Sequence, residues 1–151
     1  MDFPYRLEGR RAPDRAPRLI ESVRVAANGF AEKLGCTTLS LVLGGRSMGG
    51  RMCSMAAAEG LAVAALVLVC YPLHPPGKPE TMRTQHLPMI DVPCLFISGT
   101  RDAFGTPDEL QQASATIAGH VTHLWIDGAD HSLRRHDTVV AQHVHNWIAS
   151  L

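Results

Sequence analysis

A glycine-rich turn between an apolar run and a helical pattern is the feature that most constrains this chain. Ser47 lies in the segment at residues 44–50, directly after the apolar run at residues 39–43. The segment reads G-x-S-x-G in a strand–turn–helix context, the pattern of a nucleophile elbow. So sharp a turn strains the serine backbone, and we expect Gly45 and Gly49 to be glycine because a Cβ at either position would collide. The alternative interpretation is that Ser47 is a turn serine that only caps the following helix.

The rest of the chain alternates short apolar runs with helical patterns. This alternation predicts one α/β domain over residues 1–151, with a mostly parallel sheet flanked by helices. A proline-rich stretch at residues 72–93 predicts a long excursion over the carboxyl edge of the sheet. The expected strands are 39–43, 64–70, 94–98 and 121–126. The expected helices are 19–34, 47–59, one that begins after Thr106, and 137–151. Gly35 is expected to end the first helix, and Thr106 and Glu109 to cap the third.

The charge pattern bears on possible partners. The net charge is zero. The first 18 residues are rich in arginine, but these arginines alternate with prolines and acidic residues and have no aromatic residues between them. We therefore expect a solvated loop with some ion pairs, and no binding of nucleic acid. The longest apolar run, at residues 61–71, is too short to cross a bilayer, so no membrane association is expected.

The cysteine spacing indicates the compartment and argues against a metal. Four cysteines occur without any C-x-x-C spacing, and no H-E-x-x-H motif is present. We expect buried free thiols, no metal and no cofactor. The chain opens without a basic and apolar leader, which together with free thiols predicts a cytoplasmic protein.

An acid and a base follow Ser47 in the chain order typical of this elbow. A serine hydroxyl needs a base to take its proton and an acid to orient the base. Asp102 follows the expected strand at 94–98, and His131 follows the one at 121–126. All three residues come after carboxyl ends of parallel strands, where open α/β sheets place their sites. The sequence predicts a Ser47–His131–Asp102 triad, with Asp127 as the main rival for the acid.

Other polar residues near the expected site have open interpretations. Tyr71 and His74 begin the proline-rich excursion and either line a substrate pocket or hold the excursion together, as does His86. Arg46 flanks the elbow and either favours an acidic substrate or faces solvent. The Met48 amide, next to Ser47, is expected to donate to the oxyanion.

Several of these segments resemble a known family. The elbow at residues 44–50 and the stretch Tyr71-Pro72-Leu73-His74-Pro75-Pro76-Gly77-Lys78-Pro79 resemble the dienelactone-hydrolase-like α/β-hydrolases, in particular the testis-expressed and nonspecific-lethal-complex hydrolase-like branch. The segments 99–102 and 130–132 fit the same pattern. The resemblance implies an α/β-hydrolase fold, a Ser-Asp-His triad and cleavage of carboxylic esters without a cofactor. Dienelactone hydrolases use a cysteine nucleophile, so Ser47 departs from them.

The beginning of the chain departs from the family as well. Residues 3–5 and 9–14 resemble the end of the family's fourth strand and the loop that follows it. The earlier strands, and the loop that supplies a second oxyanion amide, are absent from this sequence. We therefore expect an N-terminally shortened fold in which the elbow strand is a bare sheet edge. A homodimer or higher oligomer would cover that edge; alternatively, the chain is a fragment of a longer enzyme.

The sequence as a whole predicts a serine hydrolase that cleaves a small carboxylic ester through an acyl-enzyme. Thioester and amide cleavage use the same residues and stay open. The alternative from another class is a catalytically weak hydrolase-like module that binds a protein partner.

Overall fold

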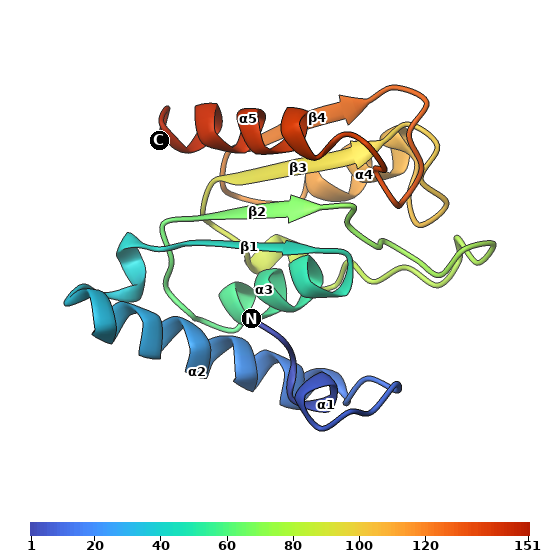
Figure 1. The fold of residues 1–151 in the computed structure, drawn as a ribbon. Coiled ribbons are helices and arrows are strands. Elements are labelled where there is room, and N and C mark those ends of the chain that lie inside the picture. Colours follow the sequence, from blue (N-terminus) through green and yellow to red (C-terminus); the bar gives the residue numbers. More distant parts are fainter.

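The computed structural model describes residues 1–151 and contains one parallel sheet. Its strands follow the chain order β1-β2-β3-β4, and each neighbouring pair is parallel. Figure 1 shows β1 at one edge of the sheet, with the N-terminus between β1 and the long helix α2. The predicted α/β architecture is confirmed. The strands are β1 (Val42–Arg46), β2 (Ala65–Val69), β3 (Cys94–Gly99) and β4 (Val121–Ile126).

Helices alternate with these strands as the apolar spacing predicts. The helix α2 ends at Gly35, which adopts a left-handed conformation (φ 65°). The helix α4 begins with the predicted capping box between Thr106 and Glu109. The helices are α1 (Pro4–Leu7), α2 (Ala16–Leu34), α3 (Met48–Ala58), α4 (Pro107–Ser114) and α5 (Asp137–Ile148), with single 3₁₀ turns at Thr38–Ser40 and Leu87–Met89.

The predicted elbow strand is displaced along the sequence. Residues 38–40 form a 3₁₀ turn, and β1 begins only at Val42 and runs through Gly44 and Gly45 to Arg46. Of the apolar residues before the strand, Leu41 is buried in the main core, whereas Leu39 is exposed. Glycines are poor strand formers, so the position of β1 depends on its pairing with β2.

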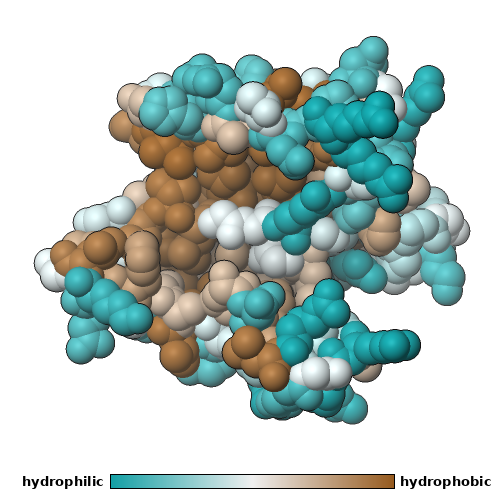
Figure 2. Space-filling view, in the orientation of Figure 1, coloured by the Kyte–Doolittle hydropathy of each residue, from teal (hydrophilic) through white to brown (hydrophobic).

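Both faces of the sheet are apolar, but they are covered unequally. One face packs on α2, α3 and α4 and forms the main core, with Leu66, Leu68 and Phe96 at its centre. The other face, with Val67 and Ile97, packs only on α5. Figure 2 shows hydrophobic side chains in the hollow between α5 and α2. One helix does not cover four strands, so part of this face near β1 is open.

The proline-rich excursion is held by a buried polar cluster. The Oγ atom of Ser54 lies 3.1 Å from the Tyr71 hydroxyl and 2.9 Å from His86 Nε2, and the last two atoms are also 2.9 Å apart. Burial lowers the pKa of His86 to about 4, so its imidazole is neutral at physiological pH. These bonds tie the excursion to α3.

The first residues form no strand. Residues 4–7 are the short helix α1, which Pro4 begins, so the expected end of a strand at residues 3–5 is wrong. No strand lies beside them to supply the hydrogen bonds that an extended segment needs. The predicted ion pairs of this region are present: Arg10 and Arg18 both contact Glu8 and Asp14. None of the helices combines the length and the hydrophobicity needed to span a membrane.

Candidate active site

Ser47 forms the sharp turn between β1 and α3. It has a positive φ of 51° with ψ −121°, a conformation that costs a non-glycine residue free energy and is found at functional sites. The turn is held by the Ser47 amide, which donates to the Val69 carbonyl of β2 at 2.8 Å. Met48 is the first residue of α3, so its N–H has no acceptor inside the helix. The elbow therefore presents a hydroxyl beside a helix N-terminus.

The glycines of the elbow differ from the predicted pair. A Cβ on Gly45 would lie 2.4 Å from the Gly49 carbonyl carbon, so glycine is required at 45 as expected. A Cβ on Gly49 would meet nothing within 4 Å, and the expected collision there is wrong. Gly50 is the second required position, because its Cβ would lie 2.6 Å from the Gly45 carbonyl oxygen. The close contact of α3 with β1 is therefore made by Gly50, the residue that follows the last glycine of the motif.

Asp102 lies in the loop after β3, and its carboxylate is almost completely enclosed. Its side chain is 1% exposed. One carboxylate oxygen accepts the Phe104 amide at 2.9 Å, which fixes the side chain in the loop. Its rival Asp127 is exposed, accepts from the Thr100 hydroxyl at 3.3 Å and has no hydrogen bond to His131.

His131 joins the acid to the serine. Its Nδ1–H donates to the two Asp102 carboxylate oxygens at 2.8 and 2.9 Å. The Ser47 hydroxyl donates to His131 Nε2 at 2.8 Å. The imidazole is a quarter exposed and packs against the Phe104 ring, with ring centroids 4.1 Å apart. Residues 47, 102 and 131 thus converge into one chain of hydrogen bonds, in the geometry by which an imidazole can take a proton from a hydroxyl.

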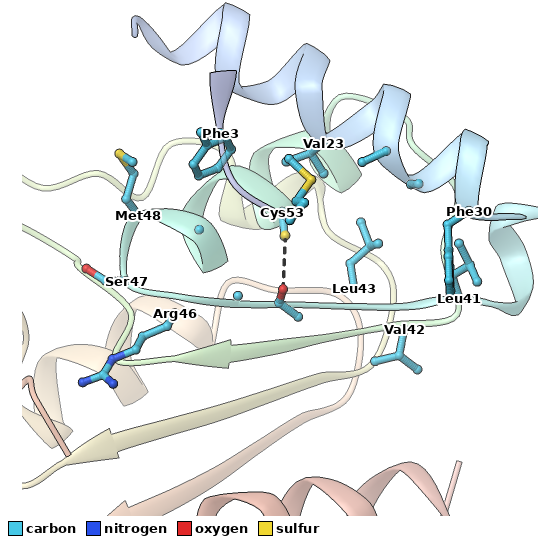
Figure 3. A pocket seen from close by; sticks show the side chains of 16 residues that line it. Phe3, Val23, Phe30, Leu41, Val42, Leu43, Arg46, Ser47, Met48 and Cys53 are labelled. Carbon is cyan, nitrogen blue, oxygen red and sulfur yellow. Dashed lines mark hydrogen bonds between the residues drawn. The ribbon is translucent and has the colours of Figure 1, made fainter. Parts of the chain in front are cut away.

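An apolar groove opens beside Ser47 and runs along the free edge of β1. Its volume is about 650 Å³, within the range of small-molecule sites. Figure 3 shows Phe3, Val23 and Phe30 on one side of the groove, Leu43 on β1, and Ser47 and Met48 at one end. The groove can take an extended apolar group whose reacting end lies at Ser47.

Two residues predicted for the substrate pocket lie elsewhere. Tyr71 is fully buried, with its hydroxyl directed at Ser54 and His86. The His74 Nδ1–H donates to the Pro75 carbonyl at 2.8 Å, and the ring is buried near Glu109. Neither lines the groove. Their hydrogen bonds stabilise the excursion, which was the alternative interpretation.

Arg46 is the third residue predicted for the pocket, and its guanidinium is engaged. It lines the groove at the Ser47 end, but the group donates to the carbonyl of His131 at 2.9 Å and to the carbonyl of Ser132. Figure 3 shows the side chain on the opposite side of β1 from Phe3 and Met48.

The cysteines are free, and one of them lies beside the site. Cys70 follows β2, and its sulfur lies within 4.8 Å of metal-ligating atoms of Asp102 and His131. Burial raises the pKa of the Cys70 thiol to about 11, so it is protonated at neutral pH. His131 Nδ1 and the Asp102 carboxylate are already bonded to each other, which leaves the protonated thiol as a neutral neighbour of the site.

Sequence reasoning missed two residues that shape the site. Phe104 holds the Asp102 carboxylate through its amide and the His131 ring through its side chain. Gly99, at the end of β3, allows close contact with the loop after β4, because a Cβ there would lie 2.1 Å from the Ala129 carbonyl oxygen. An aromatic residue two positions after the acid was the only signal for the first, and the second required the tertiary contact.

Comparison with known proteins identifies the family and the fold of this chain. A family model described as an alpha/beta hydrolase domain matches residues 1–150, so the chain belongs to the alpha/beta hydrolase family. The match extends over nearly the whole chain, which agrees with the four-stranded parallel sheet and its flanking helices.

Similar solved structures include an alpha-beta serine hydrolase homologue from Coxiella burnetii, at 18% identity and a TM-score of 0.70 over 91% of this chain. Est1E from Butyrivibrio proteoclasticus is similar at 17% identity and a TM-score of 0.71, with 91% of this chain and 70% of Est1E covered. A thermophilic esterase from Thermogutta terrifontis is similar at 20% identity and a TM-score of 0.68, with 87% and 72% covered. This chain spans 62% of the C. burnetii protein.

Proposed function

We propose that this chain is a serine hydrolase that cleaves a small carboxylic ester, with Ser47 as the nucleophile, His131 as the base and Asp102 as the acid. The single observation that carries the proposal is the unbroken chain of hydrogen bonds from Asp102 through His131 to Ser47. Such a chain activates a hydroxyl, which is otherwise a weak nucleophile. The alpha/beta hydrolase family supports a hydrolytic reaction.

The first half of the reaction forms an acyl-enzyme. The Ser47 oxygen attacks the acyl carbonyl carbon while His131 Nε2 takes the hydroxyl proton. The Asp102 carboxylate holds the imidazole in the correct tautomer and stabilises the imidazolium. The carbonyl oxygen becomes an oxyanion, to which the Met48 N–H donates. The carbon–oxygen bond of the ester then breaks, and the alcohol leaves with the proton from His131.

The second half hydrolyses the acyl-enzyme. Water attacks the acyl carbon while His131 Nε2 takes its proton, and the bond to Ser47 breaks. The carboxylic acid is released, and His131 returns a proton to the serine. With the Met48 amide as a single donor we expect slow turnover, because loss of one oxyanion donor costs about 100- to 1,000-fold in kcat.

The groove supports an ester with an apolar acyl group. The side chains that line the groove are largely hydrophobic, and Arg46 contributes the only charged side chain among them. The resemblance of residues 71–79 to the dienelactone-hydrolase-like branch supports a small ester as well, and membership of that branch stays a prediction. The four free thiols favour a reducing compartment such as the cytoplasm.

Labelling with a fluorophosphonate probe tests the proposal. The probe should label the wild type, and Ser47→Ala should abolish labelling. Ser40→Ala is the matched control, because Ser40 is exposed in the 3₁₀ turn before β1 and does not line the groove, and it should label normally. Hydrolysis of p-nitrophenyl acetate and of longer esters, compared with thioesters and amides, then defines the substrate class.

Protein binding is the second candidate function, and the free edge of β1 favours it. The unpaired backbone groups of this edge can form hydrogen bonds with an extended segment of another protein, whose apolar side chains would enter the neighbouring groove. A wild type that neither reacts with the probe nor hydrolyses any ester would support this candidate.

A further inference from the structure

The loop that carries His131 is irregular, and part of it is strained. Residues 127–136 connect β4 to α5 without regular structure. Leu133 and Arg135 both adopt positive φ, at 42° and 68°, which is costly for residues with a Cβ. Such a conformation persists only where surrounding contacts enforce it.

The local hydrogen bonds of this loop leave two carbonyls unused. The Asp130 carboxylate accepts the Ser132 amide at 2.8 Å, and the Asp130 carbonyl accepts the Leu133 amide at 3.1 Å. No backbone amide donates to the carbonyl of His131 or of Ser132. These two adjacent carbonyls are therefore free to accept a hydrogen bond from a side chain outside the loop.

Arg46, at the end of β1, donates to both carbonyls. Its guanidinium donates to the His131 carbonyl at 2.9 Å and to the Ser132 carbonyl through the same terminal nitrogen. Arg46 is also the last residue of β1 and immediately precedes Ser47. One side chain thus connects the strand that holds the serine to the backbone that holds the histidine.

We propose that Arg46 is a positioning residue that fixes the His131 loop, so that the imidazole stays between Asp102 and Ser47. The inference rests on the hydrolase function proposed above. This role differs from binding an acidic substrate, because the guanidinium already donates to two backbone carbonyls. Without Arg46, the strained loop loses its contact with β1, and His131 Nε2 moves away from the Ser47 hydroxyl.

Kinetics of Arg46→Met and Arg46→Lys test the proposal. Displacing a reacting group by about 1 Å typically costs 100-fold. We therefore expect Arg46→Met to lower kcat about 100-fold, with little change in KM, equally for p-nitrophenyl acetate and for an ester whose acyl group carries a carboxylate. Arg46→Lys should recover part of kcat, since an ammonium can still donate to one carbonyl. Arg101→Met is the matched control, because Arg101 is an exposed neighbour of Asp102 without side-chain hydrogen bonds, and it should keep wild-type kcat.

A second measurement does not depend on turnover. In proton NMR, the His131 Nδ1–H that is bonded to Asp102 should be visible in the wild type and broadened by exchange in Arg46→Met, in a protein that otherwise keeps its native spectrum. Two results would overturn the proposal. One is an Arg46→Met protein with unchanged kcat and an unchanged Nδ1–H signal, and the other is an effect confined to KM for the acidic ester. If the wild type hydrolyses no ester, the proposed function fails, while the NMR comparison still decides whether Arg46 holds the histidine.

Discussion

Gly50 in the first turn of α3 lies directly against the backbone of Gly45 in β1. A Cβ on Gly50 would be 2.6 Å from the Gly45 carbonyl oxygen and 3.6 Å from the Cα of Leu68 in the next strand. The approach lets the N-terminus of α3 pack closely against β1, next to the turn that holds Ser47. The geometry of the elbow therefore depends on a backbone contact that admits no side chain.

The two neighbouring glycines of α3 should respond in opposite ways to alanine. We expect Gly50→Ala to lower the free energy of unfolding by about 1–3 kcal/mol, because either β1 or α3 must shift to admit the methyl group. Gly49→Ala should leave stability unchanged or raise it by up to about 1 kcal/mol, since alanine is the better helix former and meets nothing there. Urea unfolding of both variants measures the difference. Equal destabilisation would contradict the assignment of the contact to Gly50.

The two candidate acids should separate on substitution. Asp102→Asn keeps the acceptor for the Phe104 amide but cannot hold the His131 tautomer, so we expect kcat to fall about 10³- to 10⁴-fold. Asp127→Asn is the control and should change kcat less than about threefold, because Asp127 is exposed and bonds only Thr100. Initial rates on p-nitrophenyl acetate compare them. A larger loss for Asp127→Asn would reverse the assignment.

The buried His86 should make stability depend on pH. Its pKa is about 4 in the folded chain and about 6.5 in the unfolded chain, so between these values only the unfolded state binds the proton. The free energy of unfolding should therefore fall as the pH drops from 6.5 towards 4, by up to about 1.4 kcal/mol per pH unit from this group.

His86→Gln, which cannot titrate, should weaken that dependence, whereas His120→Gln, at an exposed position, should keep it. Urea unfolding at pH 4.5, 5.5 and 7 measures the slopes. An identical slope in the wild type and in His86→Gln would show that other groups cause the acid sensitivity.

The free edge of β1 should associate with a second copy. The edge strand β1 has unpaired backbone groups on its free side. Beside it lies an apolar surface that includes the exposed Phe30 and the half-buried Val42. We expect a dimer or higher oligomer at micromolar concentration in sedimentation velocity. Phe30→Glu should shift the chain towards monomer, and Met89→Glu, an equally exposed apolar position outside the groove, should not. A wild-type monomer at these concentrations would contradict the prediction.

Much of the site follows from the sequence alone. Asp102 and His131 follow strands whose carboxyl ends must share one edge of a parallel sheet. The glycines around Ser47 are typical of a sharp turn. These inferences need nothing but periodicity, order and turn chemistry, which are local properties of a sequence.

Other features had no local signal. The sequence did not reveal that Gly50, not Gly49, meets β1, nor that Arg46 reaches the carbonyls of His131 and Ser132. For Tyr71 and His74 the sequence allows both a pocket role and a role in holding the excursion, and only their burial favours the second. The direction of a side chain depends on neighbours that are distant in sequence.

The alternation of strands and helices, the elbow and the order of serine, acid and base can all be derived from apolar spacing and from residues with special backbone needs. The start of β1, the open face of the sheet and the way the His131 loop is held cannot be derived in this way. These depend on pairing between strands and on contacts across the site, which exist only once the chain has folded.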